Sequence, residues 1–405
     1  MSISLNPNTG AGFQPIDGLV TKGQALSVLP PLSLYIHIPW CVKKCPYCDF
    51  NSHESKGAIP EQHYVDCLIS DLDHMLPKIW GRRVYSIFFG GGTPSLFSAR
   101  AIDTILAAVR ARVTLDSEAE ITLEANPGTV EAEKFRGFRE AGVNRLSLGI
   151  QSFNARHLQA LGRIHNDTEA HRAVTIAQKH FDNINLDLMF ALPNQTLAEC
   201  AADVESALSF GTNHLSIYHL TLEPNTLFHR FPPPLPDDEL AADMQEMIAK
   251  KLAQAGYENY ETSAYAKPLR ESKHNLNYWR FGDYVGIGAG AHAKISYPDR
   301  ITREVRYKQP DAYMQHAATG MAIQEESVVT PRELPFEFAL NALRLREGFS
   351  NTLFTERTGL SIAAMARPLA EALGRGLIEP DPLHVKPTAR GRLFLNDLLE
   401  LFLPA

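Results

Sequence analysis

The stretch LSLYIHIPWCVKKCPYCDF, residues 32–50, joins an apolar run to three of the five cysteines in the chain. The apolar run is bounded by prolines and is rich in β-branched and aromatic residues, which predicts a buried strand. Cys41, Cys45 and Cys48 follow it with the spacing C-x3-C-x2-C, and the chain has Phe50 where a fourth cysteine could stand. Because thiolates at such short spacings hold iron–sulfur clusters, the stretch predicts a metal centre directly after a strand.

The missing fourth ligand is compatible with a catalytic metal site. Three thiolates on a four-iron cluster leave one iron open, and catalytic metal sites keep a position open whereas structural sites are closed. The alternatives are three reduced cysteines in a loop, or a zinc site that His37 or His53 completes. The other two cysteines, Cys67 and Cys200, lie on apolar helix faces and are predicted to be core residues.

The bulk composition is that of an ordinary globular protein. The 405 residues are 44% hydrophobic and 21% charged, with a net charge of −7. That acidic balance gives no electrostatic case for binding nucleic acid. The sequence has no run of eighteen apolar residues that would predict a membrane span, and no charged-then-apolar start typical of a secretory signal. We therefore expect a cytoplasmic protein whose cysteines stay reduced.

Downstream of the cysteines, predicted strands alternate with predicted helices. After the strand at 32–40, the predicted strands are 84–94, 120–127, 145–153, 183–193 and 214–224. The predicted helices are 64–76, 99–113, 130–143, 168–181, 197–210 and 237–255. This alternation predicts βαβ units and a parallel sheet, and about six units fit a partial (β/α)6 barrel better than a complete eight-fold one.

The chain is expected to divide into four parts. Residues 1–32 are rich in Gly, Pro, Asn and Ser and predict a mobile N-terminal arm, and 33–265 hold the barrel. Residues 266–330 form a connecting segment, and 331–405 predict a mostly helical, winged-helix-like C-terminal domain. Winged-helix modules can bind DNA, but they also serve as capping or protein-binding units, and the acidic balance favours the latter.

Polar residues and glycines stand where several predicted strands end, which is where a parallel barrel places its chemistry. GGGTP at 90–94 ends the second strand, and glycines let the backbone approach a ligand closely. Glu124 and Asn126 end the third strand, Gln151 the fourth and Asp187 the fifth. Taken singly, each has an ordinary alternative, such as a tight turn or a solvated carboxylate.

The cysteine spacing after the first strand of a partial barrel resembles the signature of the radical S-adenosylmethionine (SAM) enzymes. Several segments, YIHIPWCVKKCPYCDF, FFGGGTPS, LEANPG, RLSLGIQSF, LGRIH and NLDLMFALPNQT, are together similar to the oxygen-independent coproporphyrinogen III oxidase group. The resemblance covers roughly residues 33–400 and implies a 4Fe–4S cluster on the three cysteines with SAM on the open iron. The implied SAM contacts are Tyr35, Tyr47, Gly91, Gly92, Thr93, Glu124, Gln151, Arg163 and Asp187.

That group has two branches, and Phe50 separates them. In the true oxidases the motif continues to a fourth cysteine, and a longer segment precedes the barrel. Here Phe50 stands at that position and about 32 residues precede the barrel. Both departures point to the HemW-like branch, which resembles the oxidase, lacks its activity, and binds haem for delivery to haemoproteins such as respiratory membrane enzymes. The oxidase itself, with its role in porphyrin biosynthesis, and a radical SAM enzyme with another substrate are the alternatives.

A second motif supports the haem-binding branch. HNLNYW at 274–279 is similar to the H-N-x-x-Y-W segment of HemW-like proteins. A histidine can ligate haem iron, so His274 is a candidate axial ligand, and the rings of Tyr278 and Trp279 offer faces for a macrocycle. His292, in the glycine-rich VGIGAGAHA, is a second candidate contact. The ordinary alternative is a hydrogen-bonded core cluster.

Overall fold

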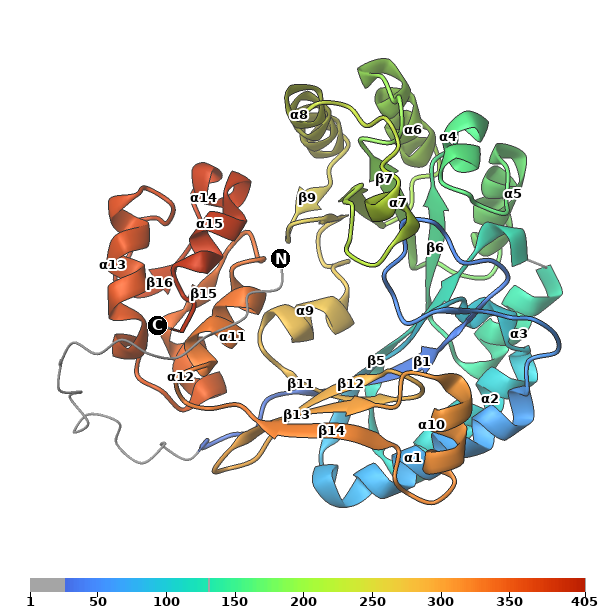
Figure 1. Ribbon diagram of the computed structural model, residues 1–405, viewed down its shortest axis with the longest axis horizontal. Coiled ribbons are helices and arrows are strands. Elements are labelled where there is room, and N and C mark those ends of the chain that lie inside the picture. The colour runs from blue at the N-terminus through green and yellow to red at the C-terminus, as the bar shows by residue number, and fades with distance from the viewer. Residues whose placement is uncertain (1–25, 130–131, 405) are drawn as a thin grey trace.

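The computed structural model describes residues 26–129 and 132–404. Within that part of the chain, one twelve-stranded sheet curls into an open barrel with helices on its outer face (Figure 1). A helical C-terminal domain stands beside the open side of the barrel. This is the predicted fold class. Residues 1–25 of the predicted N-terminal arm lie outside the described residues.

The barrel wall consists of parallel strands that neighbour one another in chain order. These strands are β1 (Leu32–Ile38), β4 (Arg83–Gly91), β5 (Thr114–Ala125), β6 (Arg145–Gln151), β7 (Ile184–Phe190) and β8 (His214–His219). Every predicted strand is present, although β5 begins at Thr114 rather than at the predicted 120. The strands are mostly buried, because helices cover their outer face.

Amphipathic helices cover the outer face of the wall. They are α1 (Glu61–Ile79), α2 (Ala99–Arg112), α3 (Ala132–Ala141), α4 (Ala155–Ala160), α5 (Asp167–Ala177), α6 (Leu197–Ser209) and α8 (Asp238–Gln254), with the short turns η1 (Pro94–Leu96), η2 (Pro127–Thr129) and α7 (Leu227–Arg230). Capping boxes at Asn166 and Thr196 begin α5 and α6, because each side chain accepts the N–H three residues on. In the described part of the chain, no helix combines the length and apolarity needed to cross a bilayer.

The segment predicted as a connection, 266–330, extends the same sheet. It contributes β11 (Asp283–Ile287), β12 (His292–Ser296), β13 (Ile301–Arg306), β14 (Ile323–Val328) and α10 (Pro310–Ala317), while β9 (Glu258–Asn259) and β10 (Ala264–Ala266) form the opposite edge. β11 pairs in parallel with β1, and the strands after it are antiparallel. These strands were not predicted because their buried faces carry charged residues such as Lys294 and Arg306.

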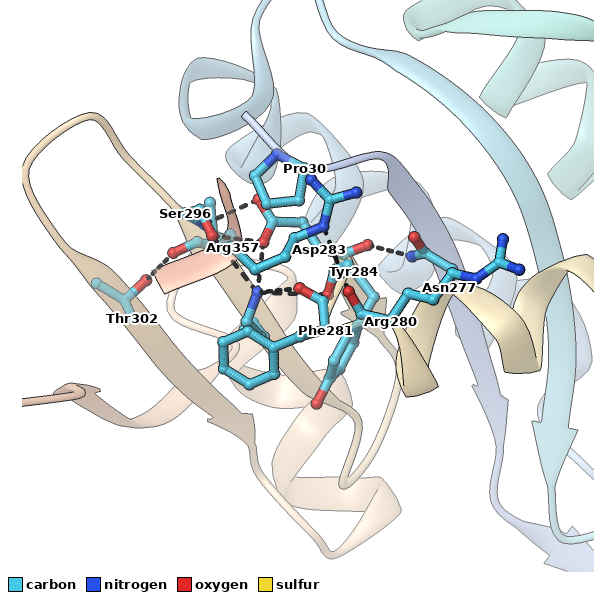
Figure 2. Close-up of polar contacts among 12 residues, drawn as sticks. Pro30, Asn277, Arg280, Phe281, Asp283, Tyr284, Ser296, Thr302 and Arg357 are labelled. Atoms are coloured by element: carbon cyan, nitrogen blue, oxygen red, sulfur yellow. Dashed lines mark hydrogen bonds and ion pairs between the residues drawn. The ribbon is translucent and has the colours of Figure 1, made fainter. Parts of the chain in front are cut away.

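A short helix, α9 (Lys273–Trp279), lies between the barrel and the C-terminal domain (Figure 1). Beside it, Figure 2 shows a buried ionic cluster around the Asp283 carboxylate. Asp283 accepts from Lys294 Nζ at 2.8 Å and pairs with Arg82 at 2.8 Å. Asn277 of α9 donates to the Asp283 carbonyl at 2.8 Å, so the cluster also holds the end of this helix.

The C-terminal domain packs around a hydrophobic cluster that includes Phe338, Phe349 and Phe354 and continues to Phe281 and Ile301 on the barrel side. Its elements are α11 (Leu334–Ala342), β15 (Phe349–Ser350), α12 (Asn351–Thr358), η3 (Ile362–Met365), α13 (Ala366–Gly374), β16 (His384–Val385), α14 (Ala389–Leu393) and α15 (Leu395–Glu400). It contacts the barrel through Arg344, which pairs with Glu261 at 3.5 Å and whose guanidinium carbon lies 4.4 Å from the ring centroid of Trp279. The domain therefore packs on the α9 side of the open barrel.

Candidate functional site

Several barrel strands contain a residue that solvent can reach among buried neighbours. Tyr35 is the partly accessible residue of β1, and Asp187 is that of β7. The Tyr35 ring stacks on Phe88 of the neighbouring strand with 6.3 Å between centroids. Glu124 on β5 is also partly accessible. Predicted contacts from three strands thus line an accessible space within the barrel.

Glu124 is the carboxyl group at the centre of this space. It accepts the Gly91 N–H at 3.3 Å. Burial and, second, the nearby Asp187 carboxylate raise the pKa of Glu124 to about 8. The Gly91 N–H and the charge of Arg145 oppose this shift without cancelling it. Carboxyl groups perturbed in this way are typical of binding sites.

Asp187 is held by two polar side chains that sequence reasoning missed. Ser147 Oγ donates to Asp187 Oδ2 at 2.8 Å, and Asn185 Nδ2 donates to Oδ1 at 2.9 Å. Burial raises the pKa of Asp187, while these bonds oppose the shift. A signal was available, because Asn185 and Asp187 are two residues apart on one strand and must share a face.

Each of the three cysteine sulfurs has a polar neighbour. Thr93 Oγ1 lies 3.5 Å from Cys41 Sγ, Arg163 Nη1 lies 3.6 Å from Cys45 Sγ, and Ser52 Oγ lies 3.7 Å from Cys48 Sγ. Burial raises the pKa values of the Cys41 and Cys48 thiols, whereas the bonds from Thr93 and Ser52 lower them. Donors aimed at the sulfurs favour the thiolate form that binds iron.

One of the two histidines of the zinc alternative is already engaged by protein groups. Both ring nitrogens of His37 have partners, Nδ1 the Tyr35 hydroxyl at 3.0 Å and Nε2 the Asn51 carbonyl at 2.8 Å. His53 Nε2 lies 3.3 Å from Asn51 Oδ1. Among the described residues, no group of three or more His, Cys, Asp or Glu side chains converges to hold a single metal ion.

Arg163 connects the cysteine loop to the end of β6. Besides its contact with Cys45, it donates to the Gly149 carbonyl at 2.8 Å, and its buried Nε has no hydrogen-bond partner. Gln151 has a positive φ of 67°, an unusual conformation for a residue with a side chain. A Cβ added at Gly149 would lie 3.1 Å from Gln151 Nε2 and 3.4 Å from Arg163 Nη2, so both predicted side chains meet over this glycine. Burial raises the pKa of Tyr47, which also interacts with Arg163.

Gly91 and Gly92, at the carboxyl end of β4, lie close to the start of the cysteine loop. Gly91 has a φ of 112°, which favours glycine, and a Cβ there would lie 2.5 Å from the His37 ring. A Cβ on Gly92 would lie 2.6 Å from the Trp40 carbonyl oxygen. Gly92 N–H donates to Ile38 O at 2.7 Å. The glycines therefore let two loops of the site pack together, and the donor set as a whole fits a cluster with a polar ligand beside it.

The structure brings two of the predicted haem contacts together, because the rings of His274 and Tyr278 lie 5.0 Å apart between centroids. His274 is only 3% exposed, its Nδ1 lies 3.0 Å from Ser86 Oγ, and its ring stacks on Phe88. Burial lowers the pKa of His274 to about 3. Tyr278 and Trp279 share its helix, whereas His292 is exposed at the start of β12.

The glycines of VGIGAGAHA were expected to let a ligand approach, but two of them, Gly288 and Gly290, instead let other parts of the chain approach. A Cβ on Gly288 would lie 2.4 Å from the His37 carbonyl oxygen, and one on Gly290 would lie 2.2 Å from Asn51 Nδ2. These glycines approach the chain itself, at both ends of the cysteine loop. Sequence reasoning missed this because the partners are more than 230 residues apart.

The remaining cysteines and one polar cavity lie away from this site. Cys67 and Cys200 are each 2% exposed, which confirms them as core residues. A polar cavity of about 360 Å³ lies at the amino ends of the strands, between Glu120, Asn183 and Arg270 among other residues. It contains none of the predicted site residues.

Comparisons with known proteins concern the chain as a whole. The chain matches a model of the Radical SAM superfamily over residues 35–207 and the HemN C-terminal domain over 329–394. The heme chaperone HemW of Escherichia coli (strain K12) is 50% identical over 377 residues, covering 93% of this chain and 99% of that protein. The heme chaperone HemW of Bacillus subtilis (strain 168) is 35% identical over 379 residues, with 92% and 99% covered.

Two further likenesses extend the comparison. The mouse protein named radical S-adenosyl methionine domain-containing protein 1, mitochondrial, is 35% identical over 404 residues, covering 96% of this chain and 91% of that protein. The solved structure of coproporphyrinogen III oxidase (HemN) from Escherichia coli, described as a radical SAM enzyme, superposes with a TM-score of 0.79. It is 24% identical, with 92% of this chain and 90% of that chain covered, so it establishes the shared fold alone.

Proposed function

The chain belongs to the HemW family, and on that premise we propose that it is a cytoplasmic radical SAM haem chaperone that binds haem and passes it to acceptor haemoproteins. The observation that carries the proposal is the cysteine loop. Each of its three thiols has a polar side chain as a neighbour. The whole chain is 50% identical to a protein named as a haem chaperone. Phe50 is 63% exposed and leaves the loop without a fourth thiol.

In this proposal Cys41, Cys45 and Cys48 hold a 4Fe–4S cluster. A cluster with one open iron supplies a position that chelates the amino and carboxylate groups of SAM and an electron for its sulfonium. The residues around it bind and orient SAM; they are Tyr35, Tyr47, Gly91, Gly92, Thr93, Glu124, Gln151, Arg163 and Asp187. The Tyr35 hydroxyl donates to His37 Nδ1, because His37 Nε2 must donate to a carbonyl, so Tyr35 is left to accept from a ligand.

The proposed haem contacts make different demands on the structure. His292 is exposed and can meet haem iron in this conformation. His274 becomes available only if α9 leaves its place between the barrel and the C-terminal domain, whereas Tyr278 and Trp279 are already partly accessible. Acceptors would be haemoproteins such as respiratory membrane enzymes, met by the C-terminal domain or the barrel mouth.

The test is anaerobic reconstitution of the cluster followed by haem titration. The variants are His274→Ala and His292→Ala, with His63→Ala on the exposed face of α1 as the matched control. We expect wild type and His63→Ala to bind haem alike, and the variant lacking the iron ligand to lose the characteristic shift of the haem absorption band. A second arm adds an apo-haemoprotein and measures haem transfer.

Three results would contradict the proposal. Wild-type protein that contains zinc without inorganic sulfide would remove the cluster. Protein that decarboxylates coproporphyrinogen would be an oxidase. Unchanged haem binding in both histidine variants would remove the two proposed iron ligands, leaving haem binding to other residues.

A further inference from the structure

Two short paired strands, β2 (Trp40–Cys41) and β3 (His53–Glu54), connect the two ends of the cysteine loop to the barrel, and we call this pair the ladder. β2 pairs with β3, with His53 N–H donating to Pro39 O at 2.7 Å and Ser55 N–H to Cys41 O at 2.9 Å. Between these ends, residues 42–44 and 49–50 are exposed. The position of the thiols therefore depends on how firmly the ladder is attached to the barrel.

Asn51 makes that attachment with its whole carboxamide. Its Nδ2 donates to Ala289 O at 2.9 Å and to Lys308 O at 2.9 Å, and its Oδ1 lies 3.3 Å from His53 Nε2. The two carbonyl acceptors fix the orientation of the amide, because only the nitrogen end can donate to them. Both acceptors belong to the segment around β12 and β13, far from the loop in sequence.

The partner loop, residues 288–291, is shaped for this contact. Gly290 has a φ of 75°, and any Cβ there would lie 2.2 Å from Asn51 Nδ2. The loop is itself fixed, since Ala289 N–H donates to Tyr64 Oη at 2.8 Å and Tyr64 Oη donates to His37 O at 2.8 Å. Asn51 thus packs on a rigid surface that also holds the end of β1.

We propose that Asn51 is a positioning residue for the cluster. By binding to loop 288–291, it holds the cysteine loop, and with it the three thiols, in place on the barrel. The inference rests on the proposed assignment of the cysteine loop to a 4Fe–4S cluster. Asn51 does not touch the cluster in this role. It fixes the backbone three residues after Cys48. Through the pairing of β2 with β3, where Ser55 N–H donates to Cys41 O, it also fixes the carbonyl of Cys41. Groups that orient metal ligands in this way typically change metal retention about 10–100-fold when removed.

The test compares iron retention in full-length protein after anaerobic reconstitution. The variants are Asn51→Ala, which removes the bonds without a clash, and Gly290→Ala, which places a methyl group against Asn51. Gly81→Ala is the matched control, because Gly81 has a similar φ of 73° and nothing within 4 Å of an added Cβ. The readouts are the rate of iron loss to a chelator and, in the cluster-free protein, amide exchange at His53 and Ser55.

We expect iron loss to be about tenfold faster in Asn51→Ala and Gly290→Ala than in wild type and Gly81→Ala. The His53 and Ser55 amides should exchange faster in the same two variants. Because the closest contacts of a methyl at position 290 are with the Asn51 carboxamide, which Asn51→Ala removes, the double variant should lose iron more slowly than two independent effects would predict.

The outcomes separate this inference from the proposed function. Wild type that takes up iron and sulfide, with Asn51→Ala retaining iron equally well, would overturn the positioning role and leave the proposed function standing. Wild type that takes up neither would overturn both. Strictly additive effects in the double variant would also overturn the role of the 51–290 contact.

Discussion

Replacing Glu124 with Gln should stabilise the protein that lacks cluster and SAM. The pKa of Glu124 is raised to about 8, chiefly by burial and then by Asp187, against an ordinary value of 4.5. The folded state therefore holds a proton that the unfolded state has lost, and stability falls as pH rises between these values. Gln keeps an oxygen for the Gly91 N–H and carries no charge, so the variant should not show this loss.

The size of the effect follows from the displacement of the pKa. A group with pKa values of about 8 folded and 4.5 unfolded costs about 3 kcal/mol at pH 7 and about 5 kcal/mol above pH 9. Glu124 is partly accessible, and water lowers such costs, so we expect about 2 kcal/mol at pH 7. The difference between variant and wild type should vanish near pH 4 and grow as the pH rises.

The assay is urea unfolding of wild type and Glu124→Gln between pH 4 and pH 9 under reducing, anaerobic conditions. Glu133→Gln, on the exposed face of α3, is the control and should track wild type at every pH. A gap between Glu124→Gln and wild type that does not widen with pH would refute the raised pKa. A variant less stable than wild type at pH 8 would show that the carboxylate is ionised and well solvated.

The remaining predictions concern the cluster and the buried ions. Cys48→Ala should abolish retention of iron and sulfide, measured by chemical analysis, while Cys200→Ala should retain both. Arg163→Met should make the reduction potential of the cluster more negative, because a positive charge 3.6 Å from Cys45 Sγ favours the reduced state. An EPR-monitored redox titration measures this potential, and an unchanged value would contradict the prediction. Lys294→Met should cost about 3 kcal/mol in urea unfolding, because Asp283 would keep only its ion pair with Arg82, whereas the exposed Lys250→Met should be neutral.

The sequence predicted the barrel well because local signals and tertiary structure agree there. Buried parallel strands are apolar runs, and the helices between them carry a 3.6-residue period, so β1 and β7 could be placed from pattern alone. The proposed SAM contacts stay a prediction, and strand position accounts for only some of them. Glu124 and Gln151 stand at the carboxyl ends of β5 and β6, which a parallel sheet brings to one edge. Tyr35 and Asp187 are the middle residues of β1 and β7, and Tyr47 and Arg163 lie in loops.

The prediction failed where burial and polarity disagree. β12 and β13 carry Lys294, Glu304 and Arg306, each at most 1% exposed, and a sequence pattern treats such residues as surface. Their burial depends on partners distant in the chain, such as Asp71 for Arg306 at 3.5 Å. Asn51 was missed for the same reason, because nothing within its own loop indicates that its partners lie at residues 289 and 308.

The placement of His274 bears on how haem could be held. For His274 to reach haem iron, α9 must lose at least three hydrogen bonds. They join Ser86 Oγ with His274 Nδ1, His274 N–H with Glu120 Oε1, and Asn277 Nδ2 with Ser33 Oγ. At about 1 kcal/mol net for each hydrogen bond, this opening costs about 3 kcal/mol, which would weaken haem binding roughly 100-fold. His292 carries no such cost because it is already exposed. Haem ligation by His274 would therefore have to be coupled to release of the C-terminal domain from Trp279, whereas ligation by His292 would leave that domain in place.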